Sequence, residues 1–244
     1  MDAATIEKIE GLVKAAHTVD VEGKTYSAWG LKRVYFEPRA TPIQVKTLTG
    51  FVDFMTYNID ALELENLEVH IESHKAVSVF GRIAGEDRGR DVYLRSELDD
   101  HLAVYPFEKF MAIEPFVIAL RSMFEPSEDR EKLISYVSKV RGGASFSLDD
   151  DGVSQTASVT KGVSGALTEK ETAPAIVKLR PFRTFREIEQ VESEFLFRMK
   201  LIDTEEHVVG VALFEADGGR WRNDAILTIK EYLGEKLPNM AIIA

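Results

Sequence analysis

Apolar and polar positions along this chain follow two spacings, a helical one of three to four residues and a strand-like alternation, which occur in separate runs. The first run predicts a helix capped by Asp2, because an aspartate side chain can accept a hydrogen bond from the first turn. Strands at 18–21 and 25–29 then form a predicted hairpin about Glu22-Gly23-Lys24, and a short strand follows at 32–36. The apolar stripe of the first helix comprises Ile6, Ile9, Leu12, Val13 and Ala16.

The clearest helix start in the sequence lies at Thr41-Pro42-Ile43-Gln44. Threonine suits the N-cap, proline suits the first helical position, and glutamine completes a capping box. These signals predict a second helix that begins at residue 42. Its apolar stripe comprises Val45, Leu48, Phe51, Val52 and Met55.

Three strands are predicted next. Residues 67–71 and 77–83 alternate in character, and a third strand near 92–94 follows the charged loop 85–90. Because the loops are too short for helical crossovers, this meander is expected to be antiparallel.

The middle of the chain has a helical pattern. Residues 107–124 are rich in aromatic and aliphatic side chains, and Pro115 is expected to start or kink a helix there. Ser127 can cap a further helix, which Arg141-Gly142-Gly143 ends.

The C-terminal part returns to strands. A hairpin of 144–148 and 153–160 is predicted about Asp149-Asp150-Asp151-Gly152, and 162–173 is predicted to be a mobile loop. The remaining predicted elements are strands at 175–182, 192–202 and 207–214, a helix at 220–233 with Gly234 as its left-handed C-cap and Pro238 just beyond, and a last strand at 240–243.

Strands and helices therefore occur in separate runs rather than in alternation, which predicts an α+β fold with mainly antiparallel sheets. Two strand-rich parts, 17–100 and 142–244, flank the helical middle. The predicted division is 1–104, 105–141 and 142–244, with one continuous domain as the alternative.

The composition of the chain excludes some kinds of site and disfavours some kinds of partner. The chain has no cysteine, which excludes disulfides and thiolate metal sites and fits a reducing cytoplasm. Acids at the start of the chain differ from a signal peptide, and charges interrupt every apolar stretch well short of a membrane span. We therefore expect a cytoplasmic chain without a membrane partner. The net charge of −11 disfavours nucleic acid as the main partner.

One segment nevertheless has the character of a nucleic-acid or nucleotide patch. It interleaves arginines, which match phosphates, with phenylalanines, which stack on bases. Its candidate binding residues are Arg180, Phe182, Arg183, Phe185 and Arg186. The alternative is that the phenylalanines enter the core while the arginines pair with Glu187, Glu189 or Glu192. Lys32-Arg33 and Arg220-Trp221-Arg222 would add to the patch only if the fold brings them near it.

The nearest approach to a metal cluster is His70, Glu72 and His74. A zinc site needs about three convergent ligands, and here the third lies beyond the strand end, so a solvated strand face is the favoured interpretation. A metal-dependent hydrolase using this region is the last-ranked hypothesis. The acidic run 149–152 lacks the downstream ligand of a calcium loop and is interpreted as a turn.

The acidic group Glu97, Asp99, Asp100 and His101 is expected to be a solvated loop or a helix start, because acid–base chemistry needs burial that splits the pKa values. No catalytic residue, metal ligand or cofactor is predicted, and the chain is expected not to be an enzyme. The aromatic residues of the middle are expected to be either core or subunit interface. They are Tyr105, Phe107, Phe110, Phe116 and Phe124.

As an ordered set, these segments resemble the YfdQ-like family of bacteriophage and prophage proteins. The features that carry the resemblance run through most of the chain. They are the hairpin at Gly23-Lys24, the helix 45–55 after a proline-rich turn, the strand pair 67–71 and 77–83, Arg141-Gly142-Gly143 leading into the Phe146 strand, the strand 174–179, and a terminal helix closing on Met240-Ala241-Ile242-Ile243.

The resemblance implies a phage protein expressed in the cytoplasm of a bacterial host, with no known cofactor. Phage proteins of this size and character often act by assembling or by binding a host protein. A non-enzymatic, homo-oligomeric ring or cage is therefore the first hypothesis. A nucleic-acid accessory protein is the alternative.

Overall fold

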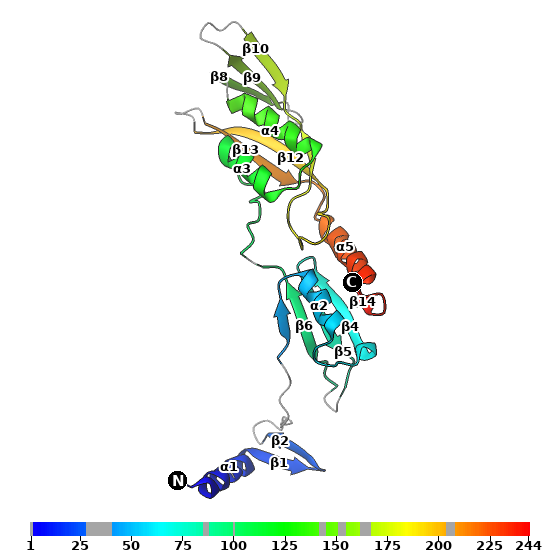
Figure 1. Cartoon of the computed structure of the whole chain (residues 1–244). Helices are drawn as coiled ribbons and strands as arrows, with labels where there is room; N and C mark the ends of the chain where they lie inside the picture. Colours follow the sequence, from blue (N-terminus) through cyan, green and yellow to red (C-terminus); the bar gives the residue numbers. More distant parts are fainter. Residues whose placement is uncertain are drawn as a thin grey trace. The chain divides into compact units, whose positions relative to one another are not determined.

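A computed structural model describes residues 2–27, 41–84, 88–99, 101–141, 145–150, 155–161, 167–203 and 208–244 (Figure 1). The chain forms two compact units, Met1–Thr41 and Pro42–Ala244. The predicted strand at 32–36 and the pair Lys32-Arg33 lie outside the described residues. Within the second unit, the divisions predicted at residues 104 and 141 stay predictions.

The first unit contains a helix and a hairpin, as predicted. Helix α1 (Ala3–His17) is capped by Asp2, whose carboxylate accepts a hydrogen bond from the Thr5 backbone N–H at 2.9 Å. Strands β1 (Thr18–Val21) and β2 (Lys24–Ser27) pair antiparallel. Their turn places Glu22 at φ 53° and Gly23 at φ 78°. Two successive positive φ values suit a two-residue hairpin, which explains the glycine.

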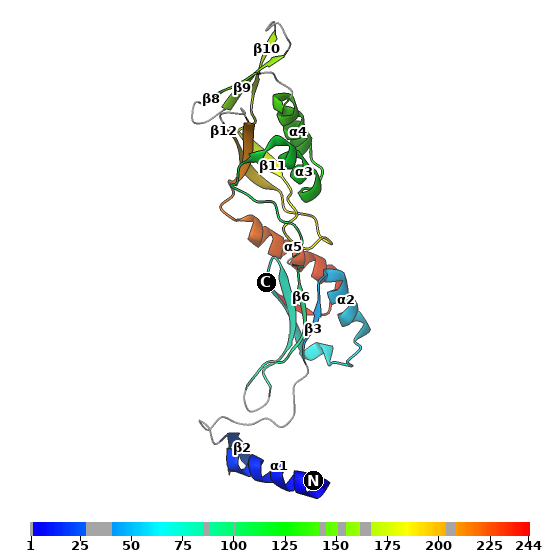
Figure 2. The same ribbon diagram turned by 90° about the vertical axis from the view of Figure 1, so that its left-hand side faces the viewer.

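In the second unit, the predicted meander forms the centre of a five-stranded sheet of order β14-β4-β5-β6-β3. Both antiparallel pairings of the meander are confirmed, whereas the two outer strands are parallel to their neighbours. Helices α2 and α5 pack with this sheet in one hydrophobic core (Figure 2). The bounds are β3 Ile43–Val45, α2 Leu48–Tyr57, the 3-10 helix η1 Leu64–Asn66, β4 Leu67–Ser73, β5 Ala76–Gly81, β6 Val92–Glu97, α5 Trp221–Lys236 and β14 Ala241–Ile243.

The predicted start of the second helix is wrong. Ile43 to Val45 form strand β3, which extends the sheet beside β6. Thr47 is the actual N-cap of α2, and its hydroxyl accepts from the Gly50 backbone N–H at 3.0 Å. The β-branched residues Ile43 and Val45 suit a strand, and Thr47, directly before the first helical residue Leu48, supplies the cap.

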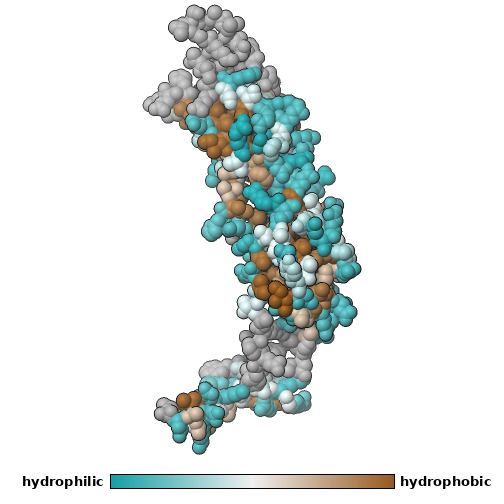
Figure 3. Space-filling view, in the orientation of Figure 1, coloured by the Kyte–Doolittle hydropathy of each residue, from teal (hydrophilic) through white to brown (hydrophobic). Residues whose placement is uncertain are grey.

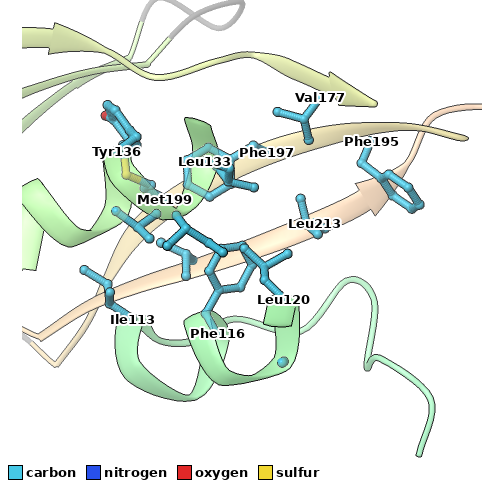
Figure 4. Packing of buried hydrophobic residues seen from close by; sticks show 14 of the residues in the cluster. Ile113, Phe116, Leu120, Leu133, Tyr136, Val177, Phe195, Phe197, Met199 and Leu213 are labelled. Atoms are coloured by element: carbon cyan, nitrogen blue, oxygen red, sulfur yellow. The ribbon is translucent and has the colours of Figure 1, made fainter. Parts of the chain in front are cut away.

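A second sheet, of order β11-β12-β13-β7, carries α3 and α4. The two helices pack on each other and on this sheet, and their apolar faces fill a second core (Figure 4). The strands predicted at 175–182, 192–202 and 207–214 are present, but the first ends at Leu179, and residue 207 lies outside the described residues. The bounds are β7 Met111–Ala112, α3 Ile113–Met123, α4 Glu128–Arg141, β11 Ile176–Leu179, β12 Ser193–Asp203 and β13 Val208–Glu215.

The helical middle agrees with the prediction in part. Ser127 caps α4, since its hydroxyl accepts from the Arg130 backbone N–H at 3.2 Å. Helix α3 begins only at Ile113, however, because Met111 and Ala112 pair with β13 as strand β7. Pro115 falls in the first turn of α3, where a missing N–H breaks no helical hydrogen bond.

A third sheet, of order β10-β9-β8, contains the predicted hairpin and a further strand where a loop is expected. Asp149 and Asp150 lie within β8 (Ser145–Asp150), which pairs with β9 (Gln155–Lys161), while Asp151 and Gly152 are outside the described residues. The predicted loop 162–173 is wrong in its second half, because β10 (Leu167–Thr172) pairs antiparallel with β9. Threonines at both ends of this polar run favour a strand once β9 offers an edge.

The end of α5 also differs from the prediction. Gly234 lies inside the helix and is not a C-cap. The helix continues to Lys236, and Leu237 follows in a non-helical conformation. Pro238 explains this end point, since a proline disfavours helical geometry at the residue before it.

The fold is α+β with mostly antiparallel sheets, as the sequence predicts. The aromatic-rich middle is mainly core: Tyr105, Phe116 and Phe124 are buried, and Phe107 stacks on Phe195 with ring centroids 5.1 Å apart. Within the described part of the chain, none of the helices combines the length and apolar character that crossing a membrane requires.

Candidate functional site

The arginine–phenylalanine segment lies beside a small pocket, named here the Lys75–Arg186 pocket. Three separate stretches form its wall: the β4–β5 turn, the loop that follows β6, and residues 182–186. The residues that line it are Lys75, Leu98, Asp99, Leu102, Val104, Phe182, Arg183, Thr184 and Arg186.

Hydrogen bonds fix these stretches to one another. The Thr184 hydroxyl donates to the His74 carbonyl oxygen at 2.6 Å, and the Leu98 backbone N–H donates to the Lys75 carbonyl oxygen at 2.8 Å. The Phe182 backbone N–H donates to the Met123 carbonyl oxygen at 2.9 Å. Hydrogen bonds therefore link the wall of the pocket to the five-stranded sheet, through the β4–β5 turn, and to the end of α3 in the other core.

The buried side chain of Gln190 forms hydrogen bonds with the backbone of the 182–186 stretch. Its buried side-chain oxygen accepts from the Arg183 backbone N–H at 3.1 Å, and its amide donates to the Phe185 carbonyl oxygen at 2.9 Å. These bonds replace the ladder that the segment lacks, since it belongs to no strand. They explain how an irregular stretch keeps its buried backbone groups satisfied.

Arg183 is the central buried cation of this region, with 5% of the residue exposed. Its guanidinium donates to Glu215 Oε1 and to the Ser193 hydroxyl, each at 2.6 Å. It also lies 3.8 Å from the centroid of the Trp221 ring. Burial lowers the pKa of Arg183 to about 10, while the Glu215 carboxylate acts in the opposite direction. Arg183 remains charged at neutral pH.

The side chains of His74 and Arg222 also contact the Trp221 ring, beside Arg183. The His74 ring meets it edge-on at 4.7 Å, and the Arg222 guanidinium lies 4.8 Å from its centroid. Burial, together with the nearby cations Lys75, Arg222 and Arg183, lowers the pKa of His74 to about 4. His74 is therefore neutral at pH 7, and the fold does bring Trp221-Arg222 to the arginine segment.

A tight turn places Trp221 at the start of α5. Asp217 accepts from the Gly219 backbone N–H at 2.9 Å, and Gly218 and Gly219 have φ values of 63° and 82°. A side chain at Gly219 would also come within 2.5 Å of Arg222 Nη1. The end of the Arg222 side chain can move aside, so it is the positive φ that favours glycine here.

The five predicted binding residues separate into two groups. Arg180 pairs with Glu189 and with Glu192, the latter at 3.6 Å, and Phe185 is fully buried, as the alternative interpretation expects for these two residues. Arg183 is buried in its own network. Arg180, Phe182 and Arg186 keep access to solvent, but Arg180 is held in its ion pairs. The Arg186 guanidinium lies 3.8 Å from the centroid of the Phe182 ring.

Two cations line the pocket besides Arg183, namely Lys75 and Arg186. Neither Lys75 nor Arg186 forms a salt bridge with any residue that the structure describes. The one acid in the wall, Asp99, is half-buried and accepts from the His101 backbone N–H at 3.0 Å. No local pattern indicates Lys75 as a member of this site, because it lies more than 100 positions from Arg186 in the sequence.

The other candidate clusters do not converge. Among the described residues, no group of three or more acids and histidines is placed to hold a metal ion. Glu72 pairs with Arg95 at 2.5 Å, and His74 faces Trp221 instead of His70. Glu97 is exposed at the end of β6. Asp100 lies outside the described residues.

A separate surface feature belongs to the first unit. None of the residues of α1 is buried, although its apolar residues recur at helical spacing. In the view of Figure 3, a few apolar patches of this unit lie among hydrophilic residues. The name "apolar seam" is used here for the apolar stripe of α1. It comprises Ile6, Ile9, Leu12 and Val13, which are 46–62% exposed.

Comparisons with protein-family models, with curated proteins and with solved structures found no match. The resemblance to the YfdQ-like family therefore stays a prediction that depends on the order of segments in the sequence.

Proposed function

We propose that this chain is a non-enzymatic phage or prophage protein of the bacterial cytoplasm that assembles into a homo-oligomeric ring or cage through α1. The observation that carries the proposal is the exposed apolar seam. A helix of 15 residues is marginal in water by itself, and most helical stability in proteins comes from packing of an apolar face. The seam therefore favours a packing partner for α1.

The spacing of the seam favours a second copy of the same helix. Ile6, Ile9, Val13 and Ala16 are separated by three, four and three residues, which is the a/d spacing of a coiled coil. Leu12 widens the stripe beyond a single seam, as in assemblies of more than two helices. Covering the exposed halves of four such side chains would stabilise each helix by about 4 kcal/mol.

The test is native mass by light scattering behind a sizing column, with negative-stain imaging of the main peak. We expect a uniform particle well above the 27.4 kDa chain mass. The double variant Ile9→Glu with Val13→Glu should dissociate it. Ala4→Glu with Ala15→Glu adds the same charges to other positions of α1 and should leave the mass unchanged.

Two results would contradict the proposal. A monomer at micromolar concentration would exclude assembly. An oligomer that both double variants leave intact would exclude α1 as the contact.

The second candidate function is binding of nucleic acid through the arginine–phenylalanine segment. Its support is narrower than the sequence suggests, because Glu189 and Glu192 hold Arg180, which leaves Phe182 and Arg186 as the accessible members for a strand to contact. One cation and one aromatic ring can contact a strand but cannot stack successive bases. This favours assembly as the first proposal.

A further inference from the structure

The Lys75–Arg186 pocket has the size of one small anionic group. The space open to the centres of water molecules is about 40 Å³. A single water centre needs about 10–15 Å³, so the pocket admits two or three waters or one tetrahedral oxyanion. A nucleobase or a peptide side chain with its backbone would not fit.

The charges around this space favour an anion. Three cations line the pocket, and among the described residues only Arg183 forms a salt bridge, to Glu215. The Glu125 carboxylate acts electrostatically on Arg186 without such a contact. Lys75 and Arg186 face the same space without ion pairs in the described chain. In a protein with 41 acids and 30 bases, two cations at one pocket that form no salt bridge with a described residue point to an anion from outside.

The donors are held in place before a ligand arrives. The Phe182 ring supports the Arg186 guanidinium, and a stacked guanidinium loses less freedom when it binds. Lys75 lies in the short β4–β5 turn, where the hydrogen bond from Thr184 fixes the preceding carbonyl group. An arginine fork together with an ammonium group suits the oxygens of phosphate.

Asp99 narrows the choice of anion. Its carboxylate repels a ligand that offers only acceptors, but it can accept a hydrogen bond from a ligand O–H. At neutral pH, inorganic phosphate carries at least one O–H, whereas sulfate carries none.

We propose that the Lys75–Arg186 pocket binds inorganic phosphate, with Lys75 and Arg186 on its charged oxygens and Asp99 accepting from its O–H. The site is independent of the proposed assembly, because its residues belong to the second unit and none of them lies on α1.

The experiment is isothermal titration calorimetry of the full chain with inorganic phosphate. Saturable binding is expected, and Lys75→Gln and Arg186→Gln should each weaken it about tenfold, the effect of losing one charge-assisted contact. Lys230→Gln removes the same charge from an exposed site on α5 and should leave the affinity unchanged. Circular dichroism and thermal melting of each variant verify the fold.

Sulfate and adenosine 5′-monophosphate distinguish the source of the group. Sulfate should bind about tenfold more weakly than phosphate, and Asp99→Asn should reduce that difference to about twofold. Tighter binding of the monophosphate than of phosphate would replace the free ion by a phosphate ester as the ligand and overturn the proposal as stated. No saturation by phosphate, or equal losses in Lys230→Gln and the pocket variants, would also overturn it.

Discussion

At the residue scale, the chemistry of the second unit centres on Arg183 and the ring of Trp221. A buried guanidinium is costly unless its charge and its N–H groups find partners. Glu215 and Ser193 accept from its two Nη atoms and the aromatic face of Trp221 lies against it, while its buried Nε has no hydrogen-bond partner among the described residues. The interleaved arginines predict a special segment, but not which arginine is buried, because Glu215 is 32 positions away in the sequence.

Replacing Arg183 by methionine should lower the free energy of unfolding by about 3 kcal/mol, since Glu215 would be left without its partner in a largely buried site. Urea unfolding followed by circular dichroism measures this. Arg180→Met is the matched control, and because its ion pairs are exposed it should cost less than about 1 kcal/mol. Equal losses in the two variants would contradict the buried-pair account.

His74 should make stability depend on pH. Its pKa is near 6.5 in the unfolded chain and about 4 in the folded one, so between these values the unfolded state binds the extra proton. Stability from this residue is complete above pH 6.5 and is lost as the pH falls towards 4. Because the imidazole is only half-buried, we expect a loss of about 1–2 kcal/mol.

The measurement is urea unfolding at pH 7, 6, 5 and 4.5 for the parent chain and for His74→Gln. Carboxylates titrate in both proteins, so the difference between their pH slopes isolates the imidazole. Identical slopes would show that His74 does not carry the effect.

At the element scale, the sequence predicts the existence and type of most helices and strands better than their ends. Periodicity identifies α1, α4 and the meander because each has a long apolar pattern of its own. The residues at which helices and strands begin and end depend on competition between neighbouring capping, turn and strand signals in the sequence. Ile43 joins β6 because the sheet edge offers hydrogen bonds that a local capping rule does not include.

Thr47→Ala tests which threonine starts α2. Loss of the hydroxyl that caps Gly50 should destabilise the protein by about 1 kcal/mol in urea unfolding. Thr41→Ala removes the cap that the sequence suggests and should have no measurable effect, since Thr41 is exposed and precedes β3. A larger loss at Thr41 than at Thr47 would contradict the observed helix start.

At the scale of the whole molecule, the pairing of distant segments lies beyond any local pattern. Strand β14 pairs in parallel with β4, so the five-stranded sheet is built from both ends of the second unit. The Lys75–Arg186 pocket has the same origin, since its three stretches meet only in the folded unit. Spacing along the chain cannot reveal such contacts, which explains why Lys75 and Asp99 were not associated with the arginine segment.

The two isoleucines of β14 give a matched test of this pairing. Ile242 packs against the core of the five-stranded sheet, whereas Ile243 is 47% exposed. Ile242→Asp should therefore cost about 2 kcal/mol of unfolding free energy, and Ile243→Asp less than about 0.5 kcal/mol. Similar costs in denaturant titrations would contradict the observed register.

The β14–β4 pairing also has a consequence for biosynthesis. Strands β4, β5 and β6 leave the ribosome long before Ala241 is added. At about 5–20 residues per second, the interval is on the order of ten seconds. During that time the edge of β4 has no partner strand, and an unpaired edge can join another chain. The nascent protein is therefore expected to depend on chaperones that cover this edge until translation reaches β14.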